Sequence, residues 1–221
     1  MLPSLAGQSV PPEPDWFRLC VLVSDQLPPD AYAALSNVAS RYNWLRIVPV
    51  STKPAALGKC ISESLDEFVD PQSCFASFRL DDDDALGRNY LRKLLSYTHE
   101  GHRGHVLTFP GGCKGWFDHT TQAYTRLADH WEPKIALGLA YVGHCQDKIR
   151  HVFQLGNHTR VDEKFPIISL PNTPMYLRSF HDDNDVLSVT ETDKRAARVD
   201  RIFEKGQPMA LKQLDEHFAL G

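Results

Sequence analysis

The short apolar run from Leu19 to Val23 constrains the fold of this chain more than any other segment. All of its residues are apolar, and the polar pair Ser24-Asp25 follows directly. Alternate residues of a strand face opposite sides, so a run without polar residues indicates a strand that is buried on both faces. Such strands occur in parallel sheets that helices cover on both sides. The run therefore predicts an α/β fold.

The segments that follow alternate between strand and helix patterns. Besides residues 19–23, the predicted strands cover residues 44–50, 74–80 and 105–110, and the predicted helices cover residues 28–42 and 88–100. Such alternation is typical of parallel strands that are joined by helices. We therefore expect a mostly parallel central sheet flanked by helices. Ligands bind such sheets beyond the carboxyl ends of the strands, which is where Asp25 and the aspartates at 81–84 are expected.

The last segment, residues 191–221, differs in character from the rest. It is charged, and its apolar residues recur as they would in one or two amphipathic helices. These apolar residues include Val199, Ile202, Phe203, Leu211, Leu214, Phe218 and Leu220. We therefore predict a main domain of residues 1–190 and a helical extension of residues 191–221 that packs on it.

Charge and cysteine content narrow the classes of partner. The formal net charge is -4 and the basic residues are scattered, so nucleic acid is not an expected partner. The chain has 5 cysteines and no CxxC pair, which indicates reduced thiols. We find no signal peptide and no apolar stretch of about 20 residues. We expect a cytoplasmic protein that makes at most peripheral contact with the inner face of the membrane.

Consecutive aspartates, Asp81 to Asp84, lie between a predicted strand and a predicted helix. One of them could cap the helix, but a cap needs a single acid. An EF-hand calcium loop is excluded, because Ala85 and Leu86 stand where the loop needs an acid or Asn and then a Gly. A phosphatase with Asp81 as nucleophile and Asp83 as acid remains an alternative, although its motif has Thr or Val in place of Ala85.

The remaining interpretation is that the aspartates hold a divalent cation. Mg²⁺ and Mn²⁺ bind carboxylate and phosphate oxygens together, so a cation would join the aspartates to the diphosphate of a nucleotide. A cation in this position neutralises the charge that develops on a departing phosphate. It also relieves the repulsion among the clustered carboxylates. We therefore predict Mn²⁺ or Mg²⁺ as the cofactor.

The stretch "RLDDDDAL", residues 79–86, resembles the DxD segment of nucleotide-diphosphosugar glycosyltransferases of the GT-A fold, and most closely that of a bacterial rhamnosyltransferase family. The stretch "LPSLAGQSVPPEPDWFRLCVLVSDQLP", residues 2–28, is similar to inverting glycosyltransferases in which a helix ending in Ser-Leu-x-x-Gln leads into a strand that closes on Asp. The stretch "YLRSFHDDND", residues 176–185, resembles a His-x-x-Asn element of the rhamnosyltransferase-like family. Together these segments cover roughly residues 2–190. The resemblance implies a GT-A-like, Rossmann-like domain.

The same resemblance implies roles for individual residues. Asp81 and Asp83 match the two acids of the DxD motif, with Asp83 as a metal ligand and Asp81 as a metal or ribose contact. His181 matches a downstream histidine that completes the metal site. Asp25 matches an acid that binds the nucleobase, and Lys59 would face the base or the diphosphate.

The activity that the resemblance implies is transfer of a sugar, rhamnose by the family's name, from a nucleotide-diphosphosugar donor to a glycan or lipid-linked saccharide acceptor. An inverting reaction needs a carboxylate that deprotonates the acceptor hydroxyl. Glu132 and Asp129 in "RLADHWEP" are the preferred candidates, and Trp131 beside them could stack on a sugar. Asp162 and Glu163 are further candidates.

One departure from the family pattern concerns the beginning of the sequence. Proteins of this fold start with a strand that forms the floor of the nucleotide pocket, whereas this sequence starts at Met1 inside what resembles the following helix. We therefore expect the first strand to be missing. A truncated, non-catalytic module that binds a metal or a partner is accordingly the main alternative to a glycosyltransferase.

Overall fold

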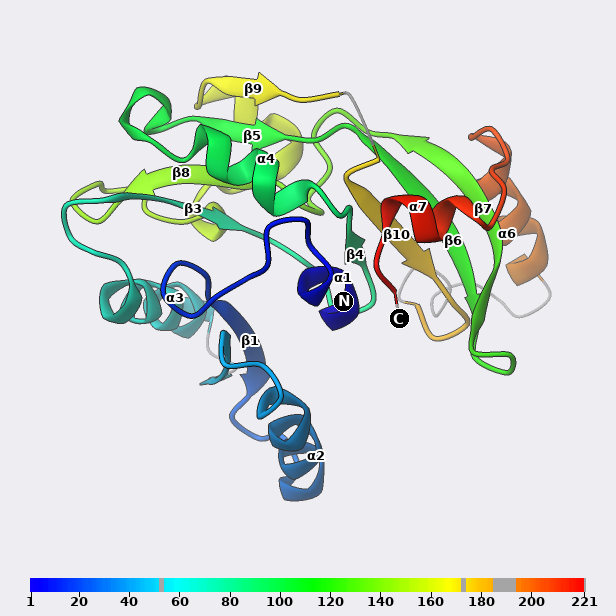
Figure 1. Cartoon of the computed structure of the whole chain (residues 1–221), viewed down its shortest axis with the longest axis horizontal. Helices are drawn as coiled ribbons and strands as arrows, with labels where there is room; N and C mark the ends of the chain where they lie inside the picture. The colour runs from blue at the N-terminus through cyan, green and yellow to red at the C-terminus, as the bar shows by residue number, and fades with distance from the viewer. Residues whose placement is uncertain (52–53, 172–173, 185–193, 221) are drawn as a thin grey trace.

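Helices and strands alternate over residues 2–78, whereas residues 106–144 hold four consecutive strands (Figure 1). The computed structural model describes residues 1–51, 54–171, 174–184 and 194–220. The α-helices are α1 (Leu2–Ala6), α2 (Pro29–Ala39), α3 (Pro54–Phe68), α4 (Tyr90–Tyr97), α6 (Arg195–Glu204) and α7 (Gln213–His217). The strands are β1 (Leu19–Ser24), β2 (Leu45–Val50), β3 (Cys74–Phe78), β4 (Ala85–Leu86), β5 (Val106–Thr108), β6 (Gly111–Asp118), β7 (Ala123–Trp131), β8 (Ala140–His144), β9 (Ile167–Ser169) and β10 (Tyr176–Phe180). Short 3₁₀ helices are η1 (Glu100–His102), η2 (Val152–Gln154) and η3 (His158–Glu163).

The described strands form separate sheets. β1 and β2 make a parallel pair, while the two four-stranded sheets have the orders β3-β8-β5-β9 and β4-β10-β6-β7. In the larger sheets, the parallel pairs are β5 with β9 and β6 with β10, and the other neighbours are antiparallel. The predicted α/β class is therefore confirmed. The described residues do not form the single, mostly parallel sheet that we predicted.

Part of the difference arises from β8, which we did not predict and which pairs antiparallel with both β3 and β5. Another part arises from residues 111–131, where we also predicted no strand. These residues form the hairpin of β6 and β7, whose ends Asp118 and Ala123 pair across a tight turn. A hairpin makes its two strands antiparallel, because the chain reverses direction within a few residues. The strands predicted at 19–23, 44–50, 74–80 and 105–110 correspond to β1, β2, β3 and β5, and the predicted helices to α2 and α4. Helix α3 was not predicted.

The largest apolar cluster surrounds Tyr90 at the start of α4. Its ring is fully buried and lies 5.3 Å from the ring of Phe78 and 4.9 Å from the ring of Phe109, measured between centroids. Leu91 and Leu94 on the same helix face are also buried. This cluster fixes α4 against the sheet of β3, β8 and β5. The aspartate run lies between β3 and α4, so the core anchors both of its flanks.

Helix α1 is attached to the same region by polar side chains. Ser4 and Gln8 are 0% and 5% exposed. Ser4 Oγ accepts from the N–H of Leu86 at 3.1 Å, while Gln8 donates to the carbonyl of Gly87 at 2.8 Å and accepts from the N–H of Leu91 at 2.9 Å. Buried polar groups of this kind stabilise a fold only when they are paired. The Ser-Leu-x-x-Gln motif therefore holds the segment that follows the aspartates.

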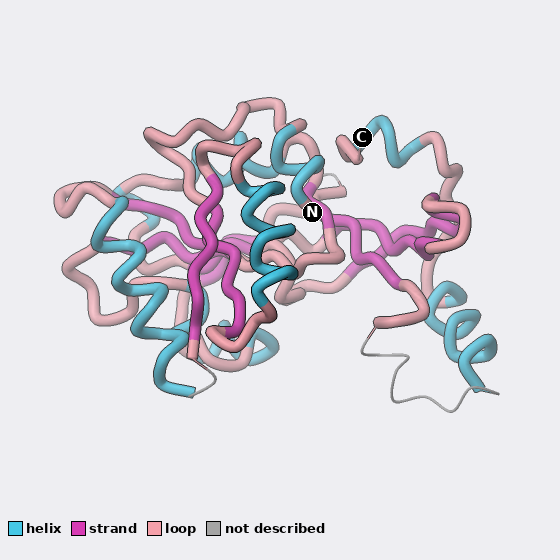
Figure 2. Tube along the Cα trace, turned by 90° about the horizontal axis from the view of Figure 1, so that it is seen from below, coloured by secondary structure: helices cyan, strands magenta, loops and turns pink. Residues whose placement is uncertain are grey.

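The C-terminal segment also packs on this part of the molecule. Leu214 and Phe218 are buried in a cluster with apolar residues of β4, β6, β7 and β10. Arg88 donates its N–H to the carbonyl of His217 at 2.8 Å and its guanidinium to the carbonyl of Asp215 at 3.0 Å. Figures 1 and 2 both show the two ends of the chain side by side. The predicted boundary between residues 190 and 191 lies outside the described residues.

The described helices and the cysteines can be compared with what a membrane span or a disulfide would require. None of the helices in the described ranges has the length and apolar character that crossing a membrane requires. The cysteines are free thiols: Cys20, Cys60, Cys74, Cys113 and Cys145.

Candidate active site

The aspartate run forms a tight turn between β3 and β4. The N–H of Asp84 donates to the carbonyl of Asp81 at 3.3 Å, which closes the turn. Exposure falls along the run, since Asp81 and Asp82 are exposed, Asp83 is half-buried and Asp84 is buried. None of them caps α4, because strand β4 intervenes and the helix begins after Asn89.

Asp84 attaches the run to strand β10. Its Oδ1 accepts from the N–H of Ser179 at 2.8 Å. Burial raises the pKa of Asp84 to about 7, because a buried carboxylate loses its hydration. The antiparallel pairing of Leu177 with Ala85 brings the two segments together. Asp84 is therefore a structural anchor whose side chain points away from solvent.

Asp83 has two polar partners from the segment after β10. Its Oδ2 lies 3.3 Å from Nε2 of His181 and accepts from Nδ2 of Asn184 at 3.2 Å. The amide of Asn184 also reaches the carbonyl of Ser179 at 3.4 Å, and the N–H of Asn184 bonds back to the carbonyl of His181 at 3.1 Å. The predicted pair Asp83 and His181 therefore meets in the structure.

Asp81 and Asp82 face outwards. Arg79 donates from Nε and Nη2 to Oδ1 of Asp81, both at 3.2 Å. Both side chains of this pair are roughly half exposed, at 42% and 49%. Exposed pairs of this kind add little to stability, so Asp81 is free to exchange Arg79 for another cation.

A second histidine, which the sequence did not single out, lies beside His181. His119, His181 and Asp183 each offer one possible metal-ligand atom, and these three atoms lie within 4.8 Å of one another. His119 belongs to the β6–β7 turn, and its ring centroid is 5.0 Å from that of His181. Among the described residues, Nδ1 of His181 is buried and has no hydrogen-bond partner. Two imidazoles and carboxylates in this arrangement fit a divalent cation.

The position of His119 follows from sheet pairing. Strands β6 and β10 are parallel, with Trp116 opposite Phe180, so the residues that follow both strands emerge at the same edge. Tyr124 on β7 bonds through its hydroxyl to Oγ of Ser179 at 2.6 Å and fixes the hairpin to β10. No local motif marks this pairing, so sequence patterns alone did not indicate His119.

A large cavity of about 1780 Å³ adjoins the aspartates. Asp81 to Asp84, Arg178, Ser179, His181, Asp183 and Asn184 form one part of its wall. The remaining wall includes apolar side chains of β1, α2, α3 and β3. The cavity therefore combines an acidic rim with an apolar wall.

The predicted nucleotide contacts Asp25 and Lys59 lie elsewhere on the surface. Asp25 is exposed at the end of β1, and its N–H donates to the carbonyl of Val50 at 3.1 Å. Lys59 on α3 lies 3.7 Å from Glu63, and its side chain is 76% exposed. Neither belongs to the described residues that line the cavity. Their roles stay predictions.

The two candidate bases have different surroundings. Asp129 lies on β7, where its Oδ1 accepts from the N–H of Gln207 and so holds the segment after α6. Glu132 follows β7 and is half-buried, with Oε2 3.9 Å from Nη1 of Arg178 and 3.7 Å from Nε2 of His130. Because Arg178 lines the cavity, the surroundings favour Glu132 over Asp129.

His130 and Tyr176 support this corner of the site. The Tyr176 hydroxyl lies 2.9 Å from Nδ1 of His130. Its ring passes directly over Gly112, where a Cβ would be 2.4 Å from ring atoms. Burial, with further repulsion from Arg178 and Lys114, lowers the pKa of His130 to about 4.

The lowered pKa of His130 predicts a loss of stability in acid. The folded protein keeps the ring neutral, whereas the unfolded chain binds a proton below its ordinary pKa of 6.5. The contribution is therefore complete above that pH and is lost as the pH falls towards about 4. Between pH 7 and about pH 4.5, the unfolding free energy should fall by about 2 kcal/mol more in the parent protein than in His130→Gln. Urea unfolding at both pH values measures this, and equal pH dependence of the two proteins would contradict it.

Comparison with known proteins places the chain in a family. A family model described as Putative rhamnosyl transferase matches residues 1–193. No curated protein and no solved structure matches the chain. The matched span includes the aspartate run, the β6–β7 hairpin and the residues after β10 that converge on Asp83.

Proposed function

Since this chain belongs to the family described as Putative rhamnosyl transferase, we propose that it is a metal-dependent glycosyltransferase that moves a sugar from a nucleotide-diphosphosugar to a hydroxyl of a glycan or lipid-linked saccharide. The observation that supports this proposal best is the convergence of His181 and Asn184 on Asp83 at the rim of the cavity. Rhamnose is the sugar that the family's description names.

The donor end of the site is built around Asp83. His181 would hold the divalent cation, Mn²⁺ or Mg²⁺, with the carboxylate of Asp83 beside it and Asp81 towards the nucleotide. A cation bound there would neutralise charge on the departing diphosphate. Asn184 fixes the carboxylate of Asp83 through its amide, so the ligand is oriented before the donor arrives. Arg178 adds a fixed positive charge on the same wall, which suits a phosphate oxygen.

The acceptor end lies near Glu132. In an inverting reaction, Glu132 would accept the proton of the attacking hydroxyl. The neighbouring Trp131 is 61% exposed, and a large exposed aromatic ring offers a face on which a sugar can stack. Arg178 lies between the two ends, since it pairs with Glu132 and also acts electrostatically on Asp84.

The GT-A-like architecture is part of the same proposal. Among the described residues, β1 pairs only with β2 and β3 only with β8. Side chains of β1 and β3 line the same cavity. A strand between them would join the two-stranded sheet to the sheet of β3, as that architecture requires.

Calorimetric titration with UDP, dTDP and GDP, each with and without Mn²⁺, tests the proposal. We expect one nucleotide to bind about tenfold or more tightly when Mn²⁺ is present. Asp83→Ala should remove this dependence on Mn²⁺, because it deletes the carboxylate at the centre of the site. The expected readout is the dissociation constant with and without the metal.

The control is Glu163→Ala, which removes an acid that is paired with Arg160 and does not line the cavity. This variant should bind nucleotides like the parent protein. Metal binding without any nucleotide binding would contradict the proposal and favour the non-catalytic module. Accumulation of a phosphorylated Asp81 would instead favour the phosphatase, for which the structure offers no specific support.

A further inference from the structure

We propose that His119, His181 and Asp183 together bind one divalent transition-metal ion, with Mn²⁺ or Zn²⁺ preferred over Mg²⁺. The assignment deepens the proposed function, because it names further ligands and a class of ion for the cation that this function uses. Only the role of this metal ion in catalysis rests on the proposed function. Metal binding itself can be measured without any nucleotide.

The turn that carries His119 has a fixed shape. Oδ1 of Asp118 accepts from the N–H of Thr120 at 2.7 Å. Gln122 has a φ of 54°, in the left-handed region, and its side-chain amide donates to the carbonyl of His119 at 2.7 Å. These contacts close the tip of the hairpin around His119. The imidazole is therefore presented by a rigid element, which favours metal affinity.

One ring nitrogen of His181 contacts a carboxylate, and the other has no hydrogen-bond partner among the described residues. Its Nε2 faces Asp83 at 3.3 Å, and its Nδ1 is buried without a partner among the described residues. A histidine that ligates a metal commonly contacts a carboxylate through its other ring nitrogen. The contact with Asp83 matches this pattern. A buried ring nitrogen without a partner is otherwise unfavourable.

Asp183 completes the set from the turn after β10. It is exposed and lines the cavity, next to Asn184. Donor atoms that share one ion at about 2.1 Å lie about 3 to 4 Å apart. The three donor atoms lie within 4.8 Å of one another, so small rotations of the exposed side chains bring them to the distances that one ion requires.

The ligand types decide the class of ion. Mg²⁺ prefers oxygen ligands and keeps several waters, whereas imidazole nitrogen suits Zn²⁺ best. Mn²⁺ also favours oxygen ligands, but as a transition-metal ion it accepts imidazole nitrogen more readily than Mg²⁺ does. Aspartates alone would serve either kind of ion. Two imidazoles beside one carboxylate shift the preference away from Mg²⁺.

Binding of the metal alone, without nucleotide, tests this inference. Mn²⁺ binding is followed by loss of the free-ion electron paramagnetic resonance signal, Zn²⁺ binding by competition with a coloured chelator, and Mg²⁺ binding by displacement of Mn²⁺. We expect His119→Ala and Asp183→Ala each to weaken Mn²⁺ binding by about 10- to 100-fold. Both side chains are exposed, so these variants should keep the thermal stability of the parent protein.

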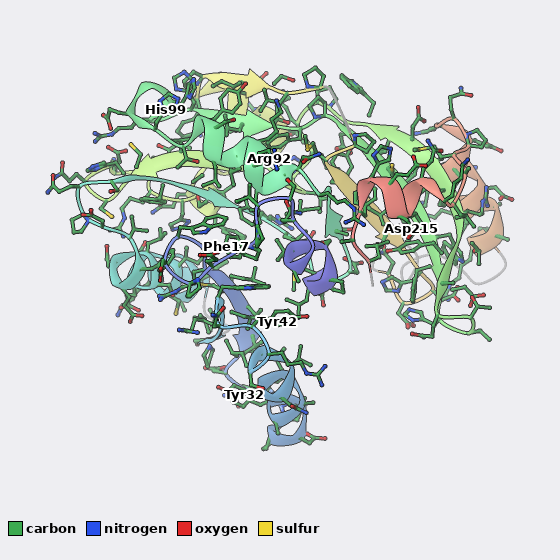
Figure 3. The ribbon with its side chains drawn as sticks, viewed as in Figure 1. Phe17, Tyr32, Tyr42, Arg92, His99 and Asp215 are labelled. Atoms are coloured by element: carbon green, nitrogen blue, oxygen red, sulfur yellow. The ribbon has the colours of Figure 1, made fainter. Side chains whose placement is uncertain are left out.

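The matched control is His99→Ala. His99 is exposed and belongs to a group of histidines with His102 and His105, and Figure 3 shows it at the opposite end of the molecule from the β6–β7 hairpin. This variant should bind Mn²⁺ like the parent protein. Unchanged Mn²⁺ affinity in His119→Ala, or Mg²⁺ affinity equal to that for Mn²⁺, would overturn the inference.

The outcomes separate this inference from the proposed function. If Mn²⁺ binding depends on His119 but no nucleotide binds, the metal site stands and the glycosyltransferase proposal fails. If a nucleotide binds with Mn²⁺ but His119→Ala changes neither affinity, the transferase proposal stands and this metal site fails.

Discussion

If Glu132 is the base of the proposed sugar transfer, we expect Glu132→Gln to lower the turnover number by about 10²- to 10⁴-fold, which is the range that loss of a general base produces. The substitution keeps the shape of the side chain and removes its ability to accept a proton. Its ion pair with Arg178, at 3.9 Å, is partly exposed and contributes little to stability. Nucleotide affinity should therefore be unchanged. Steady-state kinetics with the donor that the titrations identify, together with calorimetry, measure both quantities.

Two matched variants locate the base. Asp129→Asn keeps the acceptor oxygen that binds the N–H of Gln207, and Glu163→Gln alters an acid of η3 that pairs with Arg160. Both should retain a turnover number within about threefold of the parent protein. A large loss in Asp129→Asn with normal activity in Glu132→Gln would transfer the role to Asp129.

Tyr90→Ala reduces the unfolding free energy by about 3 to 5 kcal/mol, which is the usual cost of removing a large buried aromatic side chain. The side chain is fully buried, its hydroxyl donates to the carbonyl of Gly138 at 2.8 Å, and its ring packs between Phe78 and Phe109. The substitution leaves a cavity at the start of α4, next to the support of the aspartate run. Urea unfolding followed by circular dichroism measures the change.

Tyr90→Phe separates packing from hydrogen bonding. It keeps the ring and leaves only the carbonyl of Gly138 without its partner, so it should reduce the unfolding free energy by about 1 to 2 kcal/mol. If Tyr90→Ala cost no more than Tyr90→Phe, the ring would not be the main contributor at this position. The core described around α4 would then be wrong.

The parts of the site that the sequence could predict are those set by local pattern. Apolar runs such as Leu19 to Val23 indicate strands because burial depends on nearest neighbours along the chain. The meeting of Asp83 with His181 was predicted through resemblance and is present in the structure. This contact joins residues that are 98 positions apart in the sequence, and local sequence patterns do not predict contacts over such a separation.

The parts that sequence patterns missed depend on strand pairing. His119 reaches His181 because β6 runs parallel to β10, and Arg178 reaches Glu132 from a strand that no local motif identified. Pairing of this kind is decided by packing over the whole domain, which residue-by-residue propensity does not contain. For the same reason the described strands form separate sheets with antiparallel pairs and not one mostly parallel sheet, although each predicted strand forms.

The support of the aspartate run comes from opposite ends of the sequence. Gln8 binds Leu91 across 83 positions, and Arg88 binds Asp215 across 127 positions. A Cβ on Gly7 would lie 2.1 Å from Cβ of Ala219, so the two end segments touch directly beside this region. Contacts between residues that are distant in sequence form late and slow the folding of a chain. During synthesis on the ribosome, the contacts that Arg88 makes with Asp215 and His217 therefore cannot form until α7 has left the exit tunnel.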